Sequence, residues 1–98
     1  MNMKGIELIE KERNKQIEKY GYTPEHDSAY KNKELMFGAL AYLTAALYGS
    51  FVGVEEWPWD VEYFHSTSPN EDLAKAGAFI AAELERRNYI ASKESGNE

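Results

Sequence analysis

The chain has 98 residues, of which 43% are hydrophobic and 29% are charged, and its formal net charge is −6. This length fits one small globular domain and excludes a multidomain enzyme, a repeat array and a dinucleotide-binding domain of ordinary size. The absence of cysteine excludes disulfides, cysteine-based zinc sites and a thiol nucleophile. The acidic balance disfavours a nucleic-acid polymer as partner. No apolar run approaches the ~20 residues of a membrane span, so no membrane partner is expected.

The charges are unevenly distributed along the chain. Residues 1–22 carry five Lys or Arg and four Glu, whereas no Lys or Arg lies between Lys33 and Lys75. That stretch contains seven acidic residues, namely Glu34, Glu55, Glu56, Asp60, Glu62, Glu71 and Asp72. They can form a solvated acidic face or surround a cation, either a metal ion or an arginine.

The first predicted helix runs from about Met3 to Tyr20, because isoleucines recur there at helical spacing, and Gly21 is a typical left-handed end. Arg13 interrupts the apolar stripe between two isoleucines. An arginine in that position must reach solvent or meet a carboxylate or phosphate. We expect a buried pair with an acid of the last helix, such as Asp72 or Glu83.

Thr23 and Pro24 are typical of the first residues of a helix. A second long helix is predicted from about Asn32 to Tyr48, where leucines and alanines form a broad apolar face that Gly49 can close. The alanines indicate close packing of helices. Residues 51–54 contain one Phe and two Val and predict a short extended piece.

Segment 57–64 combines a proline with four large aromatic residues, namely Trp57, Trp59, Tyr63 and Phe64. Pro58 forbids a regular helix through its own position. We expect a structured loop or short helix that packs over the core. Alternatively, the rings can stack on a nucleobase or form a subunit interface.

The last helix has the clearest start, because Ser68 and Glu71 form a capping box. Its predicted end is near Asn88. Residues 92–98 are polar and are expected to be a disordered tail, so residues 1–91 form a single helical domain. The fold class is therefore all-α, a small helical bundle of three to four helices with an aromatic-rich Trp-Pro-Trp loop.

The densest polar cluster is Glu25-His26-Asp27. A neutral histidine beside two carboxylates can bind a divalent metal or act as a general base. Three adjacent residues point in different directions, so at most two of them can share one site. The alternative is a histidine that packs or caps at the start of a helix.

Several short segments resemble a family of short proteins encoded in bacteriophages and prophages. They are Glu12-Arg13 with Gln16, residues 21–27 (Gly-Tyr-Thr-Pro-Glu-His-Asp), Glu34-Leu35, residues 39–42, Trp57-Pro58-Trp59-Asp60, residues 72–78 and residues 82–86. The family commonly has Trp where this chain has Tyr22 and a Trp pair near Tyr63-Phe64, so these departures keep the aromatic character. The resemblance implies a viral accessory protein that acts in the cytoplasm of a bacterial host.

A binding module is the favoured function. We predict a pocket for a small nucleotide-like molecule, formed by Arg13, Gln16, Glu25, His26, Trp57, Trp59, Asp60 and Lys75. The cations would hold phosphate, a tryptophan would stack on the base, and the carboxylates would accept ribose or amino hydrogens. By analogy, the phage resemblance suggests a sponge that sequesters a nucleotide immune signal. We expect no cofactor, and we expect a homo-oligomer because so small a core is completed by further copies.

Two other function classes are alternatives. A Mg²⁺-dependent nucleotide pyrophosphohydrolase resembling the all-α MazG type would hold its metal through Glu34, Asp72, Asp27 and Glu83. That type has paired glutamates one turn apart on one helix and Glu-x-x-Asp on the next, whereas Glu34 stands alone and Lys75 lies three residues after Asp72. These departures favour binding over hydrolysis. A protein–protein inhibitor that docks through the aromatic segment is the third class.

Overall fold

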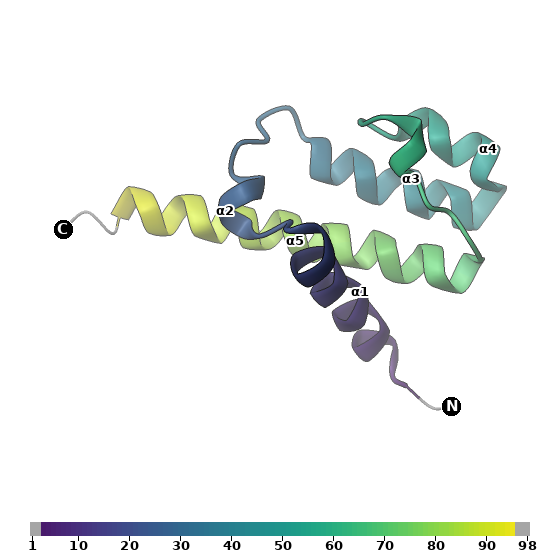
Figure 1. Cartoon of the computed structure of the whole chain (residues 1–98), viewed down its shortest axis with the longest axis horizontal. Coiled ribbons are helices and arrows are strands. Elements are labelled where there is room, and N and C mark those ends of the chain that lie inside the picture. Colours follow the sequence, from purple (N-terminus) through teal and green to yellow (C-terminus); the bar gives the residue numbers. More distant parts are fainter. Residues whose placement is uncertain (1–2, 96–98) are drawn as a thin grey trace.

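The computed structural model describes residues 3–95, which form three long helices connected by short helical turns (Figure 1). The elements are α1 (Gly5–Tyr20), α2 (Pro24–Asp27), α3 (Glu34–Tyr48), α4 (Ser50–Gly53), the 3-10 turns η1 (Val54–Glu56) and η2 (Val61–Tyr63), and α5 (Pro69–Ser95). These residues contain no β-strand, so the all-α prediction is confirmed. No described helix combines the length and the apolar composition that crossing a membrane requires.

The predicted local signals are present at the helix ends. Gly21 adopts a left-handed conformation with φ of 74° after α1. The Thr23 hydroxyl accepts the His26 N–H at 3.2 Å and caps α2, which begins at the predicted proline. At the start of α5, the Ser68 hydroxyl accepts the Glu71 N–H at 3.3 Å. Each of these contacts satisfies a backbone donor or acceptor that a helix end would otherwise leave unpaired.

Two predictions are wrong, one about the conformation of a segment and one about the end of a helix. Residues 51–54 are helical, in α4 and η1, rather than extended. Gly53 allows this short helix to pack directly on α3, since a Cβ there would lie 2.5 Å from the Ala41 carbonyl oxygen. In addition, α5 continues past Asn88 to Ser95. No Gly or Pro lies between Asn88 and Gly96, so nothing in that stretch favours an earlier end of the helix. The rest of the expected tail, residues 96–98, lies outside the described residues.

The core lies between α3 and α5, which run antiparallel side by side, while α1 crosses α5 (Figure 1). It consists of Leu35, Ala39, Tyr42, Ala76, Phe79 and Ala82. Small residues bring the helices together, as at Gly77, where a Cβ would lie 2.7 Å from the Ile9 side chain. Tyr30, Trp57, Trp59 and Phe64 pack against the core. The prediction that the aromatic segment packs over the core is therefore confirmed.

Candidate functional site

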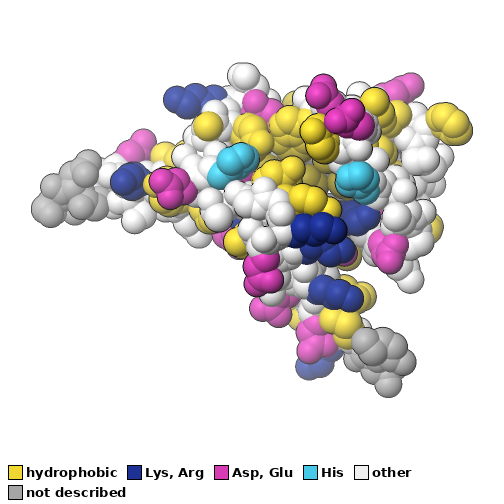
Figure 2. Space-filling view, in the orientation of Figure 1, with side chains coloured by type: hydrophobic (Ala, Val, Ile, Leu, Met, Phe, Trp, Pro, Cys, Tyr) yellow, Lys and Arg dark blue, Asp and Glu magenta, His cyan; other side chains and the backbone are white. Residues whose placement is uncertain are grey.

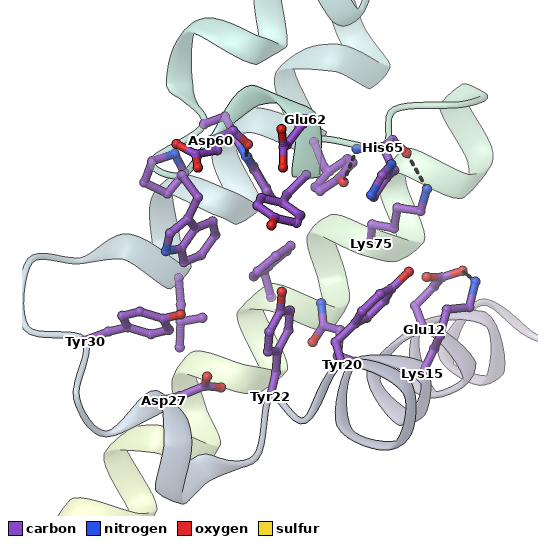
Figure 3. A pocket seen from close by; sticks show the side chains of 18 residues that line it. Glu12, Lys15, Tyr20, Tyr22, Asp27, Tyr30, Asp60, Glu62, His65 and Lys75 are labelled. Atoms are coloured by element: carbon purple, nitrogen blue, oxygen red, sulfur yellow. Dashed lines mark hydrogen bonds and ion pairs between the residues drawn. The ribbon is translucent and has the colours of Figure 1, made fainter.

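An open cleft of about 1010 Å³ lies over the core. Its lining of 18 residues comes from α1, the α2 region, α3, segment 57–65 and α5 (Figure 3). Eight of the lining residues have large aromatic rings, namely Tyr20, Tyr22, Tyr30, Tyr42, Trp57, Trp59, Tyr63 and Phe79. In the space-filling view, apolar side chains gather between the two histidines, with Lys or Arg beside one of them (Figure 2). The volume is at the upper end of the ~300–1,000 Å³ typical of small-molecule sites.

The aromatic rings that form the floor of the cleft hold each other in place. Trp59 and Tyr42 both stack on Phe79, with ring centres 5.8 and 5.9 Å away. Trp57 meets Trp59 edge-on at 5.0 Å, and its indole N–H donates to the Asp60 carbonyl at 3.0 Å. Such mutual contacts fix the rings before a ligand arrives, which lowers the entropic cost of stacking a planar group on them.

Tyr42 anchors the aromatic segment to α3. Its hydroxyl accepts the His65 N–H at 2.8 Å, and burial raises the pKa of Tyr42 to about 12. Gly38, one turn earlier on α3, leaves room for the rings, because a Cβ there would lie 3.1 Å from both Phe79 and Trp59. The tyrosine is thus neutral at physiological pH and serves as a fixed part of the wall.

Two lysines lie at one end of the cleft (Figure 3). Lys75 Nζ donates to the His65 carbonyl at 2.6 Å and lies 5.5 Å from the centre of the Tyr42 ring. Lys15 Nζ lies 3.4 Å from a carboxylate oxygen of Glu12. Because an ammonium group has three donors, both lysines keep donors available for an anionic group.

Asp27 lies at the other end of the cleft, beside Tyr22 and Tyr30 (Figure 3). Its side chain is 0% exposed. One carboxylate oxygen, Oδ1, lies 3.0 Å from His26 Nδ1, whereas Oδ2 has no hydrogen-bond partner among the described residues. Burial raises the pKa of Asp27 despite the opposing effects of His26 and Arg13. An acceptor left unpaired in this way costs about 1–3 kcal/mol, which a donor on a bound molecule would offset.

His26 supports this end of the cleft from behind. Its ring stacks on Tyr22 with centres 5.6 Å apart and meets Tyr30 edge-on at 5.7 Å. Burial raises the pKa of both tyrosines. His26 itself is absent from the lining, as is Glu25, so neither is in the predicted position facing a ligand. The structural role of His26 is to hold the Asp27 carboxylate and the rings of Tyr22 and Tyr30 in place.

Arg13 has a structural role and does not line the cleft. It is only 4% exposed and donates two hydrogen bonds to Glu85 Oε1, at 2.9 and 2.6 Å. Two more go to the Gln16 side-chain oxygen and the Tyr22 carbonyl, each at 3.0 Å. The predicted pair with an acid of the last helix is therefore present, but the acid is Glu85, and only the arginine of the pair is buried. Four of the five guanidinium N–H donors of Arg13 bind groups within the protein, and the residue lies outside the cleft lining, so the expected phosphate contact is not in place.

Five of the eight predicted ligand-binding residues line the cleft: Gln16, Trp57, Trp59, Asp60 and Lys75. The prediction missed Lys15 and most of the tyrosines. Tyr20 follows Glu12 and Gln16 at a spacing of four residues, so helical periodicity on α1 could have identified it. No local signal identifies Tyr30, which reaches the cleft through a contact with Trp59 at 5.4 Å.

The carboxylates proposed for a magnesium site are held separately. Glu34 accepts the Asn32 N–H at 2.8 Å. Asp72 accepts the Ser66 hydroxyl at 2.7 Å and the Thr67 N–H at 3.0 Å, and Glu83 is bound by Arg86 and Arg87. Within residues 3–95, no three His, Asp or Glu side chains are positioned to hold a metal ion. The arrangement that the pyrophosphohydrolase alternative needs is not assembled in this part of the chain.

The sequence matches no family model, and no curated protein or solved structure is significantly similar to it. The resemblance to short phage and prophage proteins stays a prediction, as does the action in a bacterial cytoplasm that it implies. The geometry of the cleft is therefore the basis on which a function is inferred below.

Proposed function

We propose that this protein binds a small nucleotide-like molecule in the aromatic cleft. The observation that carries the proposal is the order of groups along it: lysines at one end, fixed aromatic rings in the middle, and the unpaired Asp27 oxygen at the other end. A base stacked on the rings would gain ~1–3 kcal/mol. Its N–H groups could donate to Asp27 Oδ2, and phosphate could accept from Lys15 and Lys75.

The charges around the cleft favour a ligand with little phosphate. Two lysines face four carboxylates, those of Glu12, Asp27, Asp60 and Glu62. A triphosphate would bring its charges near the rim carboxylates, where like charges repel in a partly desolvated site. We therefore expect nucleoside monophosphates and cyclic nucleotides to bind better than triphosphates. In the phage context that the sequence suggests, such a protein would sequester a nucleotide signal of the host.

Tryptophan fluorescence offers a direct test, because both tryptophans of the chain line the cleft. The protein would be titrated separately with AMP, GMP, cyclic AMP, ATP, adenosine and inorganic phosphate. Saturable quenching by a monophosphate or cyclic nucleotide, with weaker effects of ATP and none of phosphate alone, is the expected result. If no nucleoside or nucleotide changes the fluorescence or the melting temperature, the proposal is wrong.

A matched pair of variants tests the lysine end. Lys15→Ala removes a cleft cation from α1, and Lys11→Ala removes one a single turn earlier, outside the cleft. We expect Lys15→Ala to weaken binding of a monophosphate severalfold and to leave binding of the nucleoside unchanged, since one exposed ion pair contributes less than ~1 kcal/mol. Lys11→Ala should bind both as the wild type does. Equal effects of the two substitutions would remove the assignment of this end to phosphate.

A further inference from the structure

An exposed apolar face lies on the side of the α3–α5 pair opposite the cleft. It contains seven large side chains: Met36, Leu40, Leu43 and Leu47 of α3, and Leu73, Ile80 and Leu84 of α5. Each is 37–66% exposed. We refer to these residues as the back face. All seven are apolar, although 29% of the residues of the chain are charged.

Helical geometry places the back face opposite the cleft. On α3 its residues recur at spacings of four, three and four and form a stripe about a third of a turn from Tyr42, which lines the cleft. On α5, Leu73, Ile80 and Leu84 likewise lie about a third of a turn around the helix from Phe79, which is in the floor of the cleft. Because the helices are antiparallel neighbours, the two stripes adjoin. Arg87 Nη2, 3.9 Å from Met36 Sδ, marks one end of the seam between them.

The chain exposes more surface than a monomer of its size normally does. Its accessible surface is 6662 Å², whereas folded monomers of this mass average ~5,700 Å². The excess of ~1,000 Å² slightly exceeds the ~800 Å² that each partner buries in a standard protein–protein interface. The projecting ends of α1 and α5 account for some of it (Figure 1). The back face is an apolar part of this surface, which water solvates poorly.

We propose that a second copy of this chain covers the back face and forms a symmetric dimer. Two antiparallel apolar stripes are self-complementary under a two-fold axis, because each copy then presents the same residues to the other. The charge distribution favours this contact over others. Two chains of net charge −6 repel each other. A contact through the back face places none of its seven apolar residues against a like charge, whereas a contact through the cleft rim would place Asp60 and Glu62 of one copy against the same residues of the other.

The dimer would leave both clefts open on its outer surfaces, so this inference does not depend on the proposed ligand. It is tested by light scattering coupled to size-exclusion chromatography of the full chain at low and high micromolar concentration. We expect a mass twice the 11.2 kDa of one chain. Leu43→Glu and Ile80→Glu, each placing an unpaired carboxylate in the apolar contact between the two copies, should yield the single-chain mass.

Val61→Glu is the matched control, because Val61 is 67% exposed on η2, outside the back face. This variant should retain the wild-type mass. Circular dichroism checks that each variant is folded. If Leu43→Glu or Ile80→Glu does not fold, Leu84→Glu is measured in its place. A wild-type protein of single-chain mass at every concentration would overturn the proposal and leave the face to a different partner. A dimer that survives all back-face substitutions would overturn it equally.

Discussion

Replacing Arg13 with methionine separates a structural role of this arginine from a role in ligand binding. Arg13 is 4% exposed, and its guanidinium makes four hydrogen bonds, which tie α1 to the Tyr22 carbonyl and to Glu85 on α5. Methionine keeps most of the apolar stem and removes every donor. The substitution therefore tests the hydrogen bonds with little change in packing volume.

The expected loss follows from what each partner can do afterwards. The Glu85 side chain is 42% exposed and can turn to water, so its contribution is small. The Gln16 side chain is buried and the Tyr22 carbonyl is partly buried near the end of α1, and an unpaired buried acceptor costs about 1–3 kcal/mol. We expect Arg13→Met to lower the free energy of unfolding by about 3 kcal/mol.

Urea unfolding followed by circular dichroism measures this loss, with Glu85→Gln as the control. That variant keeps an acceptor for Arg13 and loses only the charge, so its expected cost is below about 1 kcal/mol. Where Arg13→Met still folds, its ligand affinity should match that of the wild type. If Arg13→Met lowers the free energy of unfolding by less than about 0.5 kcal/mol, or keeps normal stability but abolishes binding, the structural role is refuted. Abolished binding would show that Arg13 contributes to the ligand site.

Two further predictions concern buried carboxylates. The folded-state pKa of Asp27 is raised, so the stability it contributes is present at low pH and is lost as the pH rises through that value. Asp27→Asn should therefore raise the melting temperature at pH 7 and weaken nucleotide binding about tenfold; a lower melting temperature with unchanged binding would contradict both expectations. For Glu83, hydrogen bonds from Arg86 and then Arg87 lower the pKa, so its contribution is present at neutral pH and is lost as the pH falls below about 4. Glu83→Gln should accordingly melt lower than the wild type at pH 7 and similarly to it at pH 3, whereas a pH-independent difference would argue against the ion pairs.

The two opposite faces of the α3–α5 pair illustrate how a small domain can combine a ligand site with an interface. Tyr42 and Phe79 turn toward the cleft, while Leu43 and Ile80, the next residues along each helix, turn toward the back face. A thin two-helix layer cannot bury both sides by itself. Covering one side with a second copy would stabilise the layer and leave the aromatic side free for a ligand.

The amino-acid sequence alone determined the features that depend on neighbours within about four residues. Gly21, Thr23 and Ser68 act at the helix ends where the pattern placed them, and the isoleucines around Arg13 correctly indicated that it points inward. Capping and periodicity are local interactions, so the sequence contains all the information they need.

Only the tertiary structure decided which distant residues meet. Arg13 pairs with Glu85, 72 positions away, because close packing of α1 on α5 at Gly77 sets the register between the two helices. The fold also brings Tyr30 to Trp59 and buries Asp27 at the end of the cleft, although Trp59 lies 29 or more positions from both of these residues. Many pairings of charges and rings satisfy the same helical pattern, and the fit of side chains in the folded core selects one of them.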